Sequence, residues 1–298
     1  MSRVYRSVAD LKGFSIKNCP SMPDPAGVMM CPPDFYDVKE VHNPFMVGHV
    51  GAINKTIARR QWDEVKAAFE EAGKPISLID PVPGLEDMVF CANQTFIGLN
   101  PRMERLCLLG QMRHSSRRRE VPAFEAWFRE QGYRIVRLKD PAACFEGAGD
   151  AVWHPKKRLI WGGCGFRSEP QVFEEVARVF ETPVVLLKLV NERFYHLDTC
   201  FCPLTPEAVL IYPSAFDGES LELILKIFPV VLTAGENEAI RSMACNSAIV
   251  DSSVAIAQRG AVGVAAHMQA MGLKLVEVDT SEFIKSGGSV YCLKMFLY

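Results

Sequence analysis

A helix-to-strand pattern recurs five times along this chain of 298 residues. In each copy, apolar residues at helical spacing are followed by a short apolar run of the kind that forms a strand. In three copies a glycine stands between the two, where it can end a helix because it adopts left-handed backbone angles without steric cost. The copies lie at 55–80, 119–139, 169–190, 221–233 and 260–279. The pattern predicts a chain built from five related units.

Pairs of shorter strand-like segments lie between these copies. They are 95–99 with 105–109, 151–154 with 158–161, 196–203 with 208–212, and 246–251 with 253–258. Each unit is thus predicted to run strand, strand, helix, strand, and segment 290–297 is expected to complete the N-terminal unit. Units of this length cannot bury their own apolar faces, so they must pack against one another.

Five such units around one axis would make a single α/β domain, a propeller spanning residues 1–298. The alternative is an open doubly wound sheet. It is less favoured because no glycine-rich phosphate loop joins strand and helix in the first unit. The predicted fold class is therefore α/β, with a closed ring of five ββαβ repeats.

Composition and charge exclude several classes of protein. Apolar residues make up 49% of the chain and charged residues 23%, which is typical of globular proteins. The net charge of −2 comes without long runs of one sign, so nucleic acid or an anionic membrane is not an expected partner. The longest apolar stretches, 183–190 and 227–234, are too short to span a bilayer.

The chain is expected to be cytoplasmic. Residues 1–17 lack the apolar core of a signal peptide. The ten cysteines are scattered and show no zinc-type spacing, so most are expected to be reduced core residues. Homo-oligomerisation is an open possibility, which the sequence does not decide.

Cys292 follows Gly287 and Gly288 in a segment that begins as a loop and continues into an apolar strand. Glycines before a cysteine allow close backbone approach and leave the sulfur accessible to a substrate. By composition alone, a small buried core cysteine would be the favoured interpretation.

His196 stands two residues before Asp198, and strand alternation would put both side chains on one face. A histidine beside a carboxylate is a natural general acid and base. The alternative is a hydrogen-bonded pair at a sheet edge.

Glu146 and Asp150 lie in the glycine-rich sequence Phe-Glu-Gly-Ala-Gly-Asp. Two carboxylates on such a turn could hold a metal or an organic cation. A metal is less favoured because no second cluster of ligands is nearby in the sequence, and an ordinary turn is the alternative.

Five further polar residues stand at loop-to-strand or loop-to-helix positions: Asn43, Asp87, Asn93, Arg117 and Arg167. The proline after Asn43 favours an extended conformation there. For the two arginines, a solvated surface position is the alternative.

Taken together, these motifs resemble the guanidine-modifying, or amidinotransferase, superfamily with the pentein fold, which includes arginine deiminases, dimethylarginine dimethylaminohydrolases and arginine dihydrolases. The resemblance covers nearly the whole chain in the family order. It runs through Asn-Pro-Phe-Met, Asp-Met-Val-Phe, Ser-Arg-Arg-Arg-Glu, Phe-Glu-Gly-Ala-Gly-Asp, Gly-Phe-Arg-Ser, His-Leu-Asp and Gly-Gly-Ser-Val-Tyr-Cys. The resemblance implies a five-bladed pseudosymmetric propeller of ββαβ units.

The resemblance also implies roles for the singled-out residues. Cys292 matches the nucleophile, His196 the general acid and base, and Glu146 the carboxylate that binds and orients the guanidinium. The expected substrate-binding residues are Asp198 as a second acid, Arg167 for the substrate carboxylate, and Arg117, Asn43, Asp87, Asn93 and Asp150. No metal or organic cofactor is required by this chemistry.

Asn93 departs from the deiminase and dimethylargininase pattern, which has aspartate there. The segment resembles the asparagine version of N-succinylarginine dihydrolase and of cyanobacterial-type arginine dihydrolases. Asparagine both donates and accepts hydrogen bonds, so it can hold a neutral ureido group as well as a guanidinium. The favoured activity is therefore that of an arginine dihydrolase, forming ornithine, ammonia and carbon dioxide from a small guanidino substrate.

The alternatives are an arginine deiminase or dimethylargininase that forms citrulline, an amidinotransferase, and a non-catalytic pentein binding protein. Whether segment 103–116 forms a lid is a question that the sequence leaves open.

Overall fold

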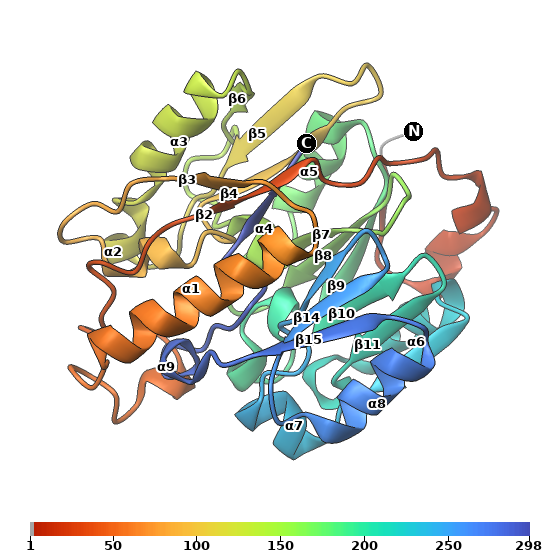
Figure 1. Ribbon diagram of the computed structural model, residues 1–298. Coiled ribbons are helices and arrows are strands. Elements are labelled where there is room, and N and C mark those ends of the chain that lie inside the picture. The colour runs from red at the N-terminus through yellow and green to blue at the C-terminus, as the bar shows by residue number, and fades with distance from the viewer. Residues whose placement is uncertain (1–2) are drawn as a thin grey trace.

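The computed structural model describes residues 3–298, and the strands of this part of the chain form five small sheets (Figure 1). Four sheets have three strands and one has four. Each three-stranded sheet has one antiparallel and one parallel pair, as a ββαβ unit requires, because only the parallel pair needs a helical crossover. The four-stranded sheet has a second parallel pair.

The first sheet joins segments from opposite ends of the sequence. Strand β2 (Gly27–Met30) is followed by helix α1 (Lys55–Glu71) and strand β3 (Ile76–Leu78), which lies parallel to β2. The C-terminal strand β16 (Met295–Leu297) lies antiparallel on the other edge of β2. The predicted pairing of the C-terminal segment with the N-terminal unit is confirmed, although β16 covers only the last part of the predicted run.

The other four units follow the predicted order of strand, strand, helix, strand. The second contains β4 (Thr95–Leu99), β5 (Arg105–Leu109), α3 (Val121–Glu130) and β6 (Arg134–Val136). The third contains β7 (Ala151–Trp153), β8 (Ile160–Cys164), α5 (Val172–Phe180) and β9 (Val184–Lys188). The fourth contains β10 (Phe201–Thr205), β11 (Ala208–Ile211), α6 (Gly218–Ile227) and β12 (Val230–Thr233). The fifth contains β13 (Ala248–Val250), β14 (Val254–Gln258), α8 (Val262–Ala270) and β15 (Lys274–Val278).

Short helices fill the connections between these elements. The α-helical ones are α2 (Ser115–Arg118), α4 (Gly147–Asp150), α7 (Glu236–Arg241) and α9 (Ser281–Ile284). The 3-10 turns are η1 (Val8–Leu11), η2 (Ile16–Asn18), η3 (Pro44–Met46), η4 (Glu86–Val89), η5 (Glu192–Phe194), η6 (Leu197–Thr199) and η7 (Pro213–Ala215). Turn η6 corrects one prediction, because the strand expected at 196–203 begins only at Phe201.

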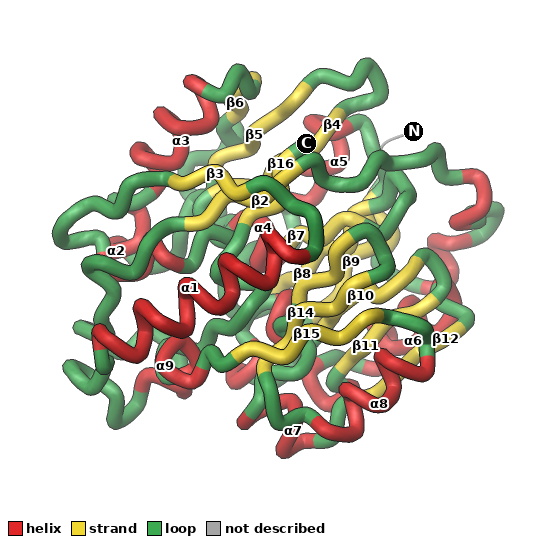
Figure 2. Tube along the Cα trace, viewed as in Figure 1, coloured by secondary structure: helices red, strands yellow, loops and turns green. Residues whose placement is uncertain are grey.

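Burial falls from the first strand of a unit to the third. Every residue of β4 is buried, whereas no residue of β12 is buried. In Figure 2 the strands are gathered toward the middle, and α3 and α8 lie at the periphery. Loops that precede the first strands therefore lie close to the centre of the molecule.

Strand β9 is an exception to this gradient because a strand that the sequence analysis missed covers its edge. Strand β1 (Val4–Tyr5) pairs with β9 in parallel, and four of the five residues of β9 are buried. A covered edge cannot template pairing with another chain.

Helix α5 shows how the apolar pattern attaches a helix to its sheet. Its buried residues are Val172, Phe173, Val176, Ala177 and Phe180. This spacing places them on one face of a helix with 3.6 residues per turn. The glutamates Glu174 and Glu175 lie on the opposite side in the first turn, where a negative charge favours the helix dipole.

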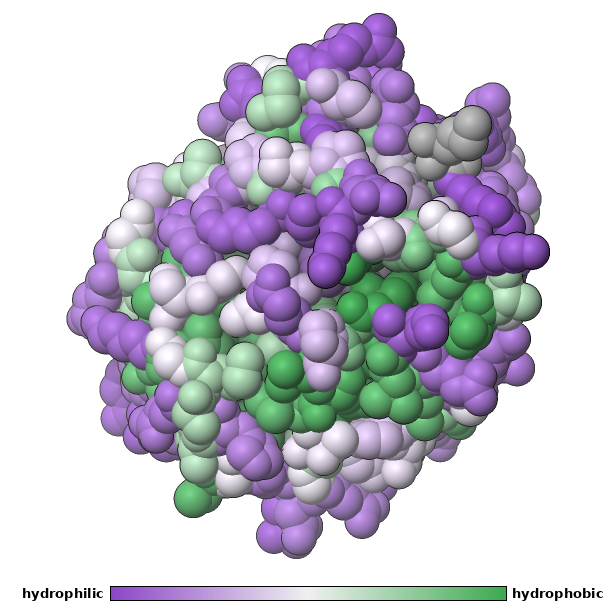
Figure 3. All heavy atoms as spheres, turned by 90° about the vertical axis from the view of Figure 1, so that its right-hand side faces the viewer, coloured by the Kyte–Doolittle hydropathy of each residue, from purple (hydrophilic) through white to green (hydrophobic). Residues whose placement is uncertain are grey.

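The face at the right-hand side of Figure 1, which Figure 3 turns toward the viewer, carries a broad apolar area. Helix α6 and strand β12 lie on this side and contribute the exposed Leu225 and the half-exposed Val230 and Val231. Exposed apolar areas often mark interaction surfaces. Homo-oligomerisation stays a prediction.

The described part of the chain bears on two further expectations. All ten cysteines are buried and unpaired, as predicted for reduced core residues. None of the helices between residues 3 and 298 combines the length and the apolar character needed to cross a bilayer.

The close packing of β8 against α5 leads to a stability prediction. A Cβ atom at Gly162 would lie 2.6 Å from the ring of the fully buried Phe173. We expect Gly162→Ala to lower the free energy of unfolding by about 1–3 kcal/mol, because overpacked cores cannot relax fully. Denaturant titration would measure this.

Gly218→Ala is the matched control, because its Cβ would meet no atom within 4 Å at the start of α6. It should change the free energy of unfolding by no more than about 1 kcal/mol. Equal destabilisation by both variants would contradict the packing argument.

Candidate active site

Seven of the predicted site residues line one narrow cavity of about 20 Å³, which is room for about one water molecule. They come from distant parts of the sequence and are Asn43, Asp87, Asn93, Arg117, Arg167, His196 and Cys292. The other three, Glu146, Asp150 and Asp198, are buried directly behind this lining. The structure thus brings all ten predicted residues together in two layers.

Cys292 lies in the loop between α9 and β16 and is 3% exposed. Its sulfur is 3.3 Å from Asp198 Oδ2 and receives a hydrogen bond of 3.1 Å from Asn246 Nδ2. Burial raises the pKa of the Cys292 thiol well above its ordinary value, and the Asp198 carboxylate raises it further. The thiol is therefore protonated until a cation or a base enters the site.

The glycines before Cys292 are required by close contacts, as the sequence predicted. Gly287 has a left-handed φ of 78°, and a Cβ there would lie 2.7 Å from the Tyr195 hydroxyl. A Cβ at Gly288 would lie 2.5 Å from the Phe90 ring and 3.2 Å from Cys292 Cβ. Any larger residue would displace the loop that carries the sulfur.

His196 caps turn η6 instead of lying on a strand, so the predicted strand alternation with Asp198 is wrong. Its Nε2 lies 2.7 Å from Glu146 Oε2, whereas Asp198 turns toward Cys292. A 3-10 turn sends the two side chains in different directions. The carboxylate beside His196 is therefore that of Glu146.

Glu146 is fully buried, and both of its oxygens are engaged by the protein. Oε1 accepts a hydrogen bond from the Arg113 backbone, and Oε2 accepts one of 3.0 Å from Arg167 Nη1 besides the contact to His196. Burial alone would raise its pKa, but Arg167 and His196 outweigh burial and hold the pKa of Glu146 well below its ordinary range. With both oxygens occupied in this way, Glu146 is placed to orient His196, and its contact with a guanidinium stays a prediction.

Asp150 is likewise a supporting residue in the structure. Its Oδ2 accepts hydrogen bonds from the backbone (3.2 Å) and hydroxyl (2.6 Å) of Ser168, and its Oδ1 accepts one from the Leu197 backbone. Burial raises its pKa to about 6. With both oxygens occupied and no share in the cavity wall, Asp150 holds the segments that carry Arg167 and His196.

Asp198 lies behind the sulfur and is almost fully buried. Burial raises its pKa to about 7, although the hydrogen bond from Cys292 acts in the opposite direction. Its Oδ1 has no hydrogen-bond partner within residues 3–298.

Arg117 is buried, so its surface interpretation is excluded. Its Nη1 donates to Asn93 Oδ1 at 2.8 Å, and its remaining donors contact Glu120 and the backbone oxygens of Asp87 and Phe90. Arginine has donors only, so the side-chain oxygen of Asn93 must be the atom that faces it. The Asn93 Nδ2 group is left without a partner in the described chain.

Arg167 and Asn43 fix the opposite wall of the cavity. The Arg167 guanidinium lies 4.5 Å above the Tyr195 ring and donates to the His42 backbone oxygen. Asn43 caps η3 and donates from Nδ2 to the backbone oxygen of Ser286, next to the glycine loop. Both residues therefore connect segments that surround Cys292.

Segment 103–116 contains strand β5, whose residues pair with β4 and β6, then a loop at 110–114 and the start of α2. Gln111 in this loop is bridged to Phe145. The segment is not a free lid.

The sequence analysis missed Asn246, which contacts Cys292. The repeat contained a signal for it. Asn93, Glu146, His196, Asn246 and Cys292 each lie within five residues before the first strand of a unit. One polar or reactive residue thus occupies the corresponding position of every unit.

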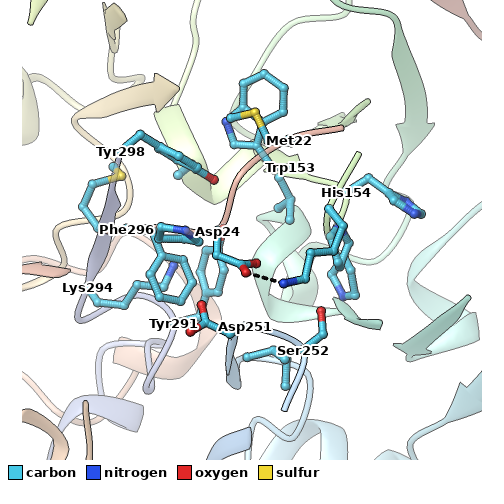
Figure 4. A pocket seen from close by; sticks show the side chains of 18 of the residues that line it. Met22, Asp24, Trp153, His154, Asp251, Ser252, Tyr291, Lys294, Phe296 and Tyr298 are labelled. Atoms are coloured by element: carbon cyan, nitrogen blue, oxygen red, sulfur yellow. Dashed lines mark hydrogen bonds and ion pairs between the residues drawn. The ribbon is translucent and has the colours of Figure 1, made fainter. Parts of the chain in front are cut away.

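Lys294 was also missed, and it borders a second cavity, of about 100 Å³, that shares no lining residue with the first (Figure 4). Aromatic side chains make up much of its wall, with Trp153, Tyr291 and Phe296 among them. The Lys294 ammonium lies 3.0 Å from the centre of the Tyr291 ring and makes no hydrogen bond or ion pair with residues 3–298. Burial lowers the pKa of Lys294 to about 7, while Asp198 acts to raise it.

The acidic and sulfur-bearing residues of the site do not form a metal centre. Within the described residues, no three His, Cys, Asp or Glu side chains are grouped so that they could hold a metal ion.

The lowered pKa of Lys294 predicts a pH-dependent stability. The unfolded chain keeps this proton up to the ordinary pKa of 10.5, whereas the folded protein loses it near pH 7. The unfolded state binds more protons between these values, so the free energy of unfolding rises with pH across this interval. Lys294→Met should therefore be more stable than the parent near pH 7, with a difference that shrinks toward pH 10.

Urea titrations at several pH values would measure the difference in the free energy of unfolding between Lys294→Met and the parent. The titration of groups common to both proteins cancels in this difference. Lys12→Met, at an exposed position, should show no such trend. A constant difference between parent and Lys294→Met from about pH 7 to about pH 10 would contradict the assignment.

Comparisons with known proteins agree with the geometry. The family described as "N,N dimethylarginine dimethylhydrolase, eukaryotic" matches residues 40–297. The bifunctional arginine dihydrolase/ornithine cyclodeaminase ArgZ of Synechocystis is 36% identical over 275 residues, which are 92% of this chain and 38% of ArgZ. This chain therefore corresponds in length to well under half of that relative.

A second relative is the N(G),N(G)-dimethylarginine dimethylaminohydrolase of Mycobacterium tuberculosis, 32% identical over 90% of this chain and 85% of that protein. Among solved structures, the N-terminal domain of ArgZ, in an asparagine-to-serine variant covalently bonded to a reaction intermediate, superposes with a TM-score of 0.86. It is 36% identical and covers 91% of this chain and 97% of that domain. The chain belongs to the dimethylarginine dimethylaminohydrolase family of the guanidine-modifying pentein superfamily.

Proposed function

We propose that this protein hydrolyses the guanidine C–N bond of arginine through a covalent intermediate on Cys292, and that it acts as an arginine dihydrolase. The observation that carries the proposal is a set of unpaired buried atoms in the cavity wall and directly behind it. Within the described chain, Asp87 Oδ1 and Asp198 Oδ1 are acceptors without donors, and Asn93 Nδ2 is a donor without an acceptor. Buried polar atoms are rarely left unpaired, so such a set calls for a ligand.

The two acids fit a guanidinium, which presents only N–H donors and a positive charge. The Asn93 amide fits the ureido group that is hydrolysed in the second round. Because Arg117 occupies its oxygen, Asn93 offers the cavity an N–H group, which is what the oxygen of a ureido group needs. A dihydrolase must bind both groups, since the ureido product of its first round is the substrate of its second.

The proposed reaction begins when the cationic substrate lowers the pKa of Cys292 by its charge. The thiol proton passes to Asp198, whose Oδ2 is 3.3 Å away, and the thiolate attacks the guanidine carbon. His196, oriented by Glu146, gives a proton to the departing ammonia and then takes one from the water that releases the amidino group. In this proposal Arg167 receives the carboxylate of the amino acid, because a guanidinium pairs well with a carboxylate.

Dimethylargininase activity is the second candidate, because the matching family and the mycobacterial relative carry that name. It would use the same nucleophile, release an alkylamine and stop at citrulline. Arginine deiminase activity would stop at the same product.

We also propose that residues 1–298 form one domain in which the five sheets close into a five-bladed ring. The pairing of β16 with β2 supports closure, because it joins the last unit to the first. The cytoplasmic location stays a prediction from the sequence.

The direct test is product analysis after incubation with arginine. We expect ornithine and ammonia without accumulated citrulline, and we expect Cys292→Ser to lose turnover by about a thousandfold or more, because the nucleophile is gone. Cys19→Ser is the matched control at a cysteine remote from the cavity, and it should keep the parent rate. Citrulline as the end product would exclude the dihydrolase, and turnover of methylated arginine alone would favour the dimethylargininase.

Asn93→Asp tests the role of the amide. Aspartate can still accept the hydrogen bond from Arg117, but it replaces the N–H donor by a second acceptor. We expect attack on arginine to continue while hydrolysis of citrulline falls about a hundredfold, since a ureido oxygen would then meet a carboxylate. Chromatography of the products would show citrulline accumulating.

Asn191→Asp is the control for this substitution, because aspartate caps a helical turn as well as asparagine does. Its product should stay ornithine. Unchanged ornithine production by Asn93→Asp would show that the second round does not need the Asn93 amide.

A further inference from the structure

Asn246 holds the nucleophile loop from behind. It lies in the turn before β13, and none of its surface is exposed. Its Oδ1 accepts hydrogen bonds from the backbone N–H groups of Ser289 (2.9 Å) and Cys292 (3.2 Å). Its Nδ2 donates to the backbone oxygen of Asp198 (3.0 Å) and to the sulfur of Cys292 (3.1 Å). One side chain thus connects the loop of the sulfur with the turn of the neighbouring acid.

The orientation of this amide is fixed by its partners. Two N–H donors face one end, so that end must be the oxygen. A carbonyl oxygen faces the other end, so that end must be the NH₂ group. Because a flipped amide would lose its three contacts with backbone groups, an N–H group is held against the Cys292 sulfur.

This N–H group and the other surroundings of the sulfur act on the pKa of Cys292 in opposite directions. Burial and the Asp198 carboxylate both raise the pKa of Cys292, whereas the hydrogen bond from Asn246 lowers it. Within residues 3–298, Asn246 is the only side chain that donates a hydrogen bond to this sulfur. A hydrogen bond to an ionised acceptor is about twice as strong as one to a neutral acceptor, so the contact favours the thiolate over the thiol.

The place of Asn246 in the repeat agrees with a role in the site. It occupies the position before the first strand of its unit, as Asn93, His196 and Cys292 do in theirs. A residue that only stabilised the turn would need the two bonds to Oδ1, and it would not need a donor aimed at the sulfur.

We propose that Asn246 is a positioning residue that holds the Cys292 loop and stabilises the thiolate during attack. This inference rests on the proposed function in one respect, namely that Cys292 is the nucleophile. It adds a fixed hydrogen-bond donor to a site whose other contact with the sulfur, Asp198, disfavours the thiolate.

The test uses the reactivity of the free protein, so it does not depend on a substrate. The rate of alkylation by iodoacetamide, followed by mass spectrometry of the full chain, is measured from about pH 6 to about pH 10, with Cys292→Ser as the background. In Asn246→Asp, the oxygen that accepts from the loop is kept and the donor becomes an acceptor. We expect the midpoint of the alkylation profile to rise by about one pH unit or more, and the rate near neutral pH to fall about tenfold.

Three comparisons separate this role from a purely structural one. Asn54→Asp, at the cap of α1, should leave the profile unchanged. If Asn246→Asp does not fold, Asn246→Ala or Asn246→Ser, which remove the donor without adding a charge, take its place. With arginine as substrate, kcat should fall while KM changes by less than about threefold, because Asn246 does not line the cavity.

The alkylation test can fail or succeed independently of the product analysis that tests the proposed function. A folded Asn246 variant with the alkylation profile of the parent would overturn the inference. A shifted profile would support it, even if the parent formed citrulline or did not turn over arginine. If Cys292 of the parent were not alkylated at any pH, both the inference and the nucleophile assignment would fall.

Discussion

The buried carboxylate of Glu146 is the contact on which the site depends. A carboxylate removed from water is costly unless it is paired and hydrogen-bonded, and Glu146 is both. It contacts Arg167, His196 and the backbone of Arg113, which lie in three separate segments. Removing any one partner would leave the buried charge only partly compensated. The same interactions that keep Glu146 ionised therefore determine where the imidazole and the guanidinium stand.

The repeat explains why such residues can meet at all. The third strand is the most exposed one in four of the five units, so the first strands and the loops before them lie nearer the centre of the molecule. Asn93, Glu146, His196, Asn246 and Cys292 occupy this position in successive units. A site built in this way needs no long insertion, because each unit contributes one side chain from an equivalent place.

The helices and strands with a periodic pattern could be predicted from the sequence, whereas the partners of the side chains in the site could not. Short strand-like runs predicted the bounds of β4 and β5, and helical spacing predicted α5, because these patterns are local. The partner of His196 depends on η6, a 3-10 turn whose direction no local pattern predicts. The burial of Arg117 and the supporting role of Asp150 likewise depend on partners that are remote in sequence or packed from other elements. Asn246 was accessible through the repeat, had the position before each first strand been compared.

The electrostatics of the sulfur bear on how one site could act twice. In the first round of the proposed reaction the guanidinium supplies a positive charge beside Cys292, which offsets the effect of burial and of Asp198 on its pKa. In the second round the ureido substrate is neutral and supplies no such charge. The thiolate must then rely on fixed donors of the protein. Asn246 Nδ2 is such a donor at the sulfur, and Asn93 Nδ2 is one for the ureido oxygen. A site that must act on a neutral group after a cationic one therefore needs amides where a single-round enzyme can use acids alone.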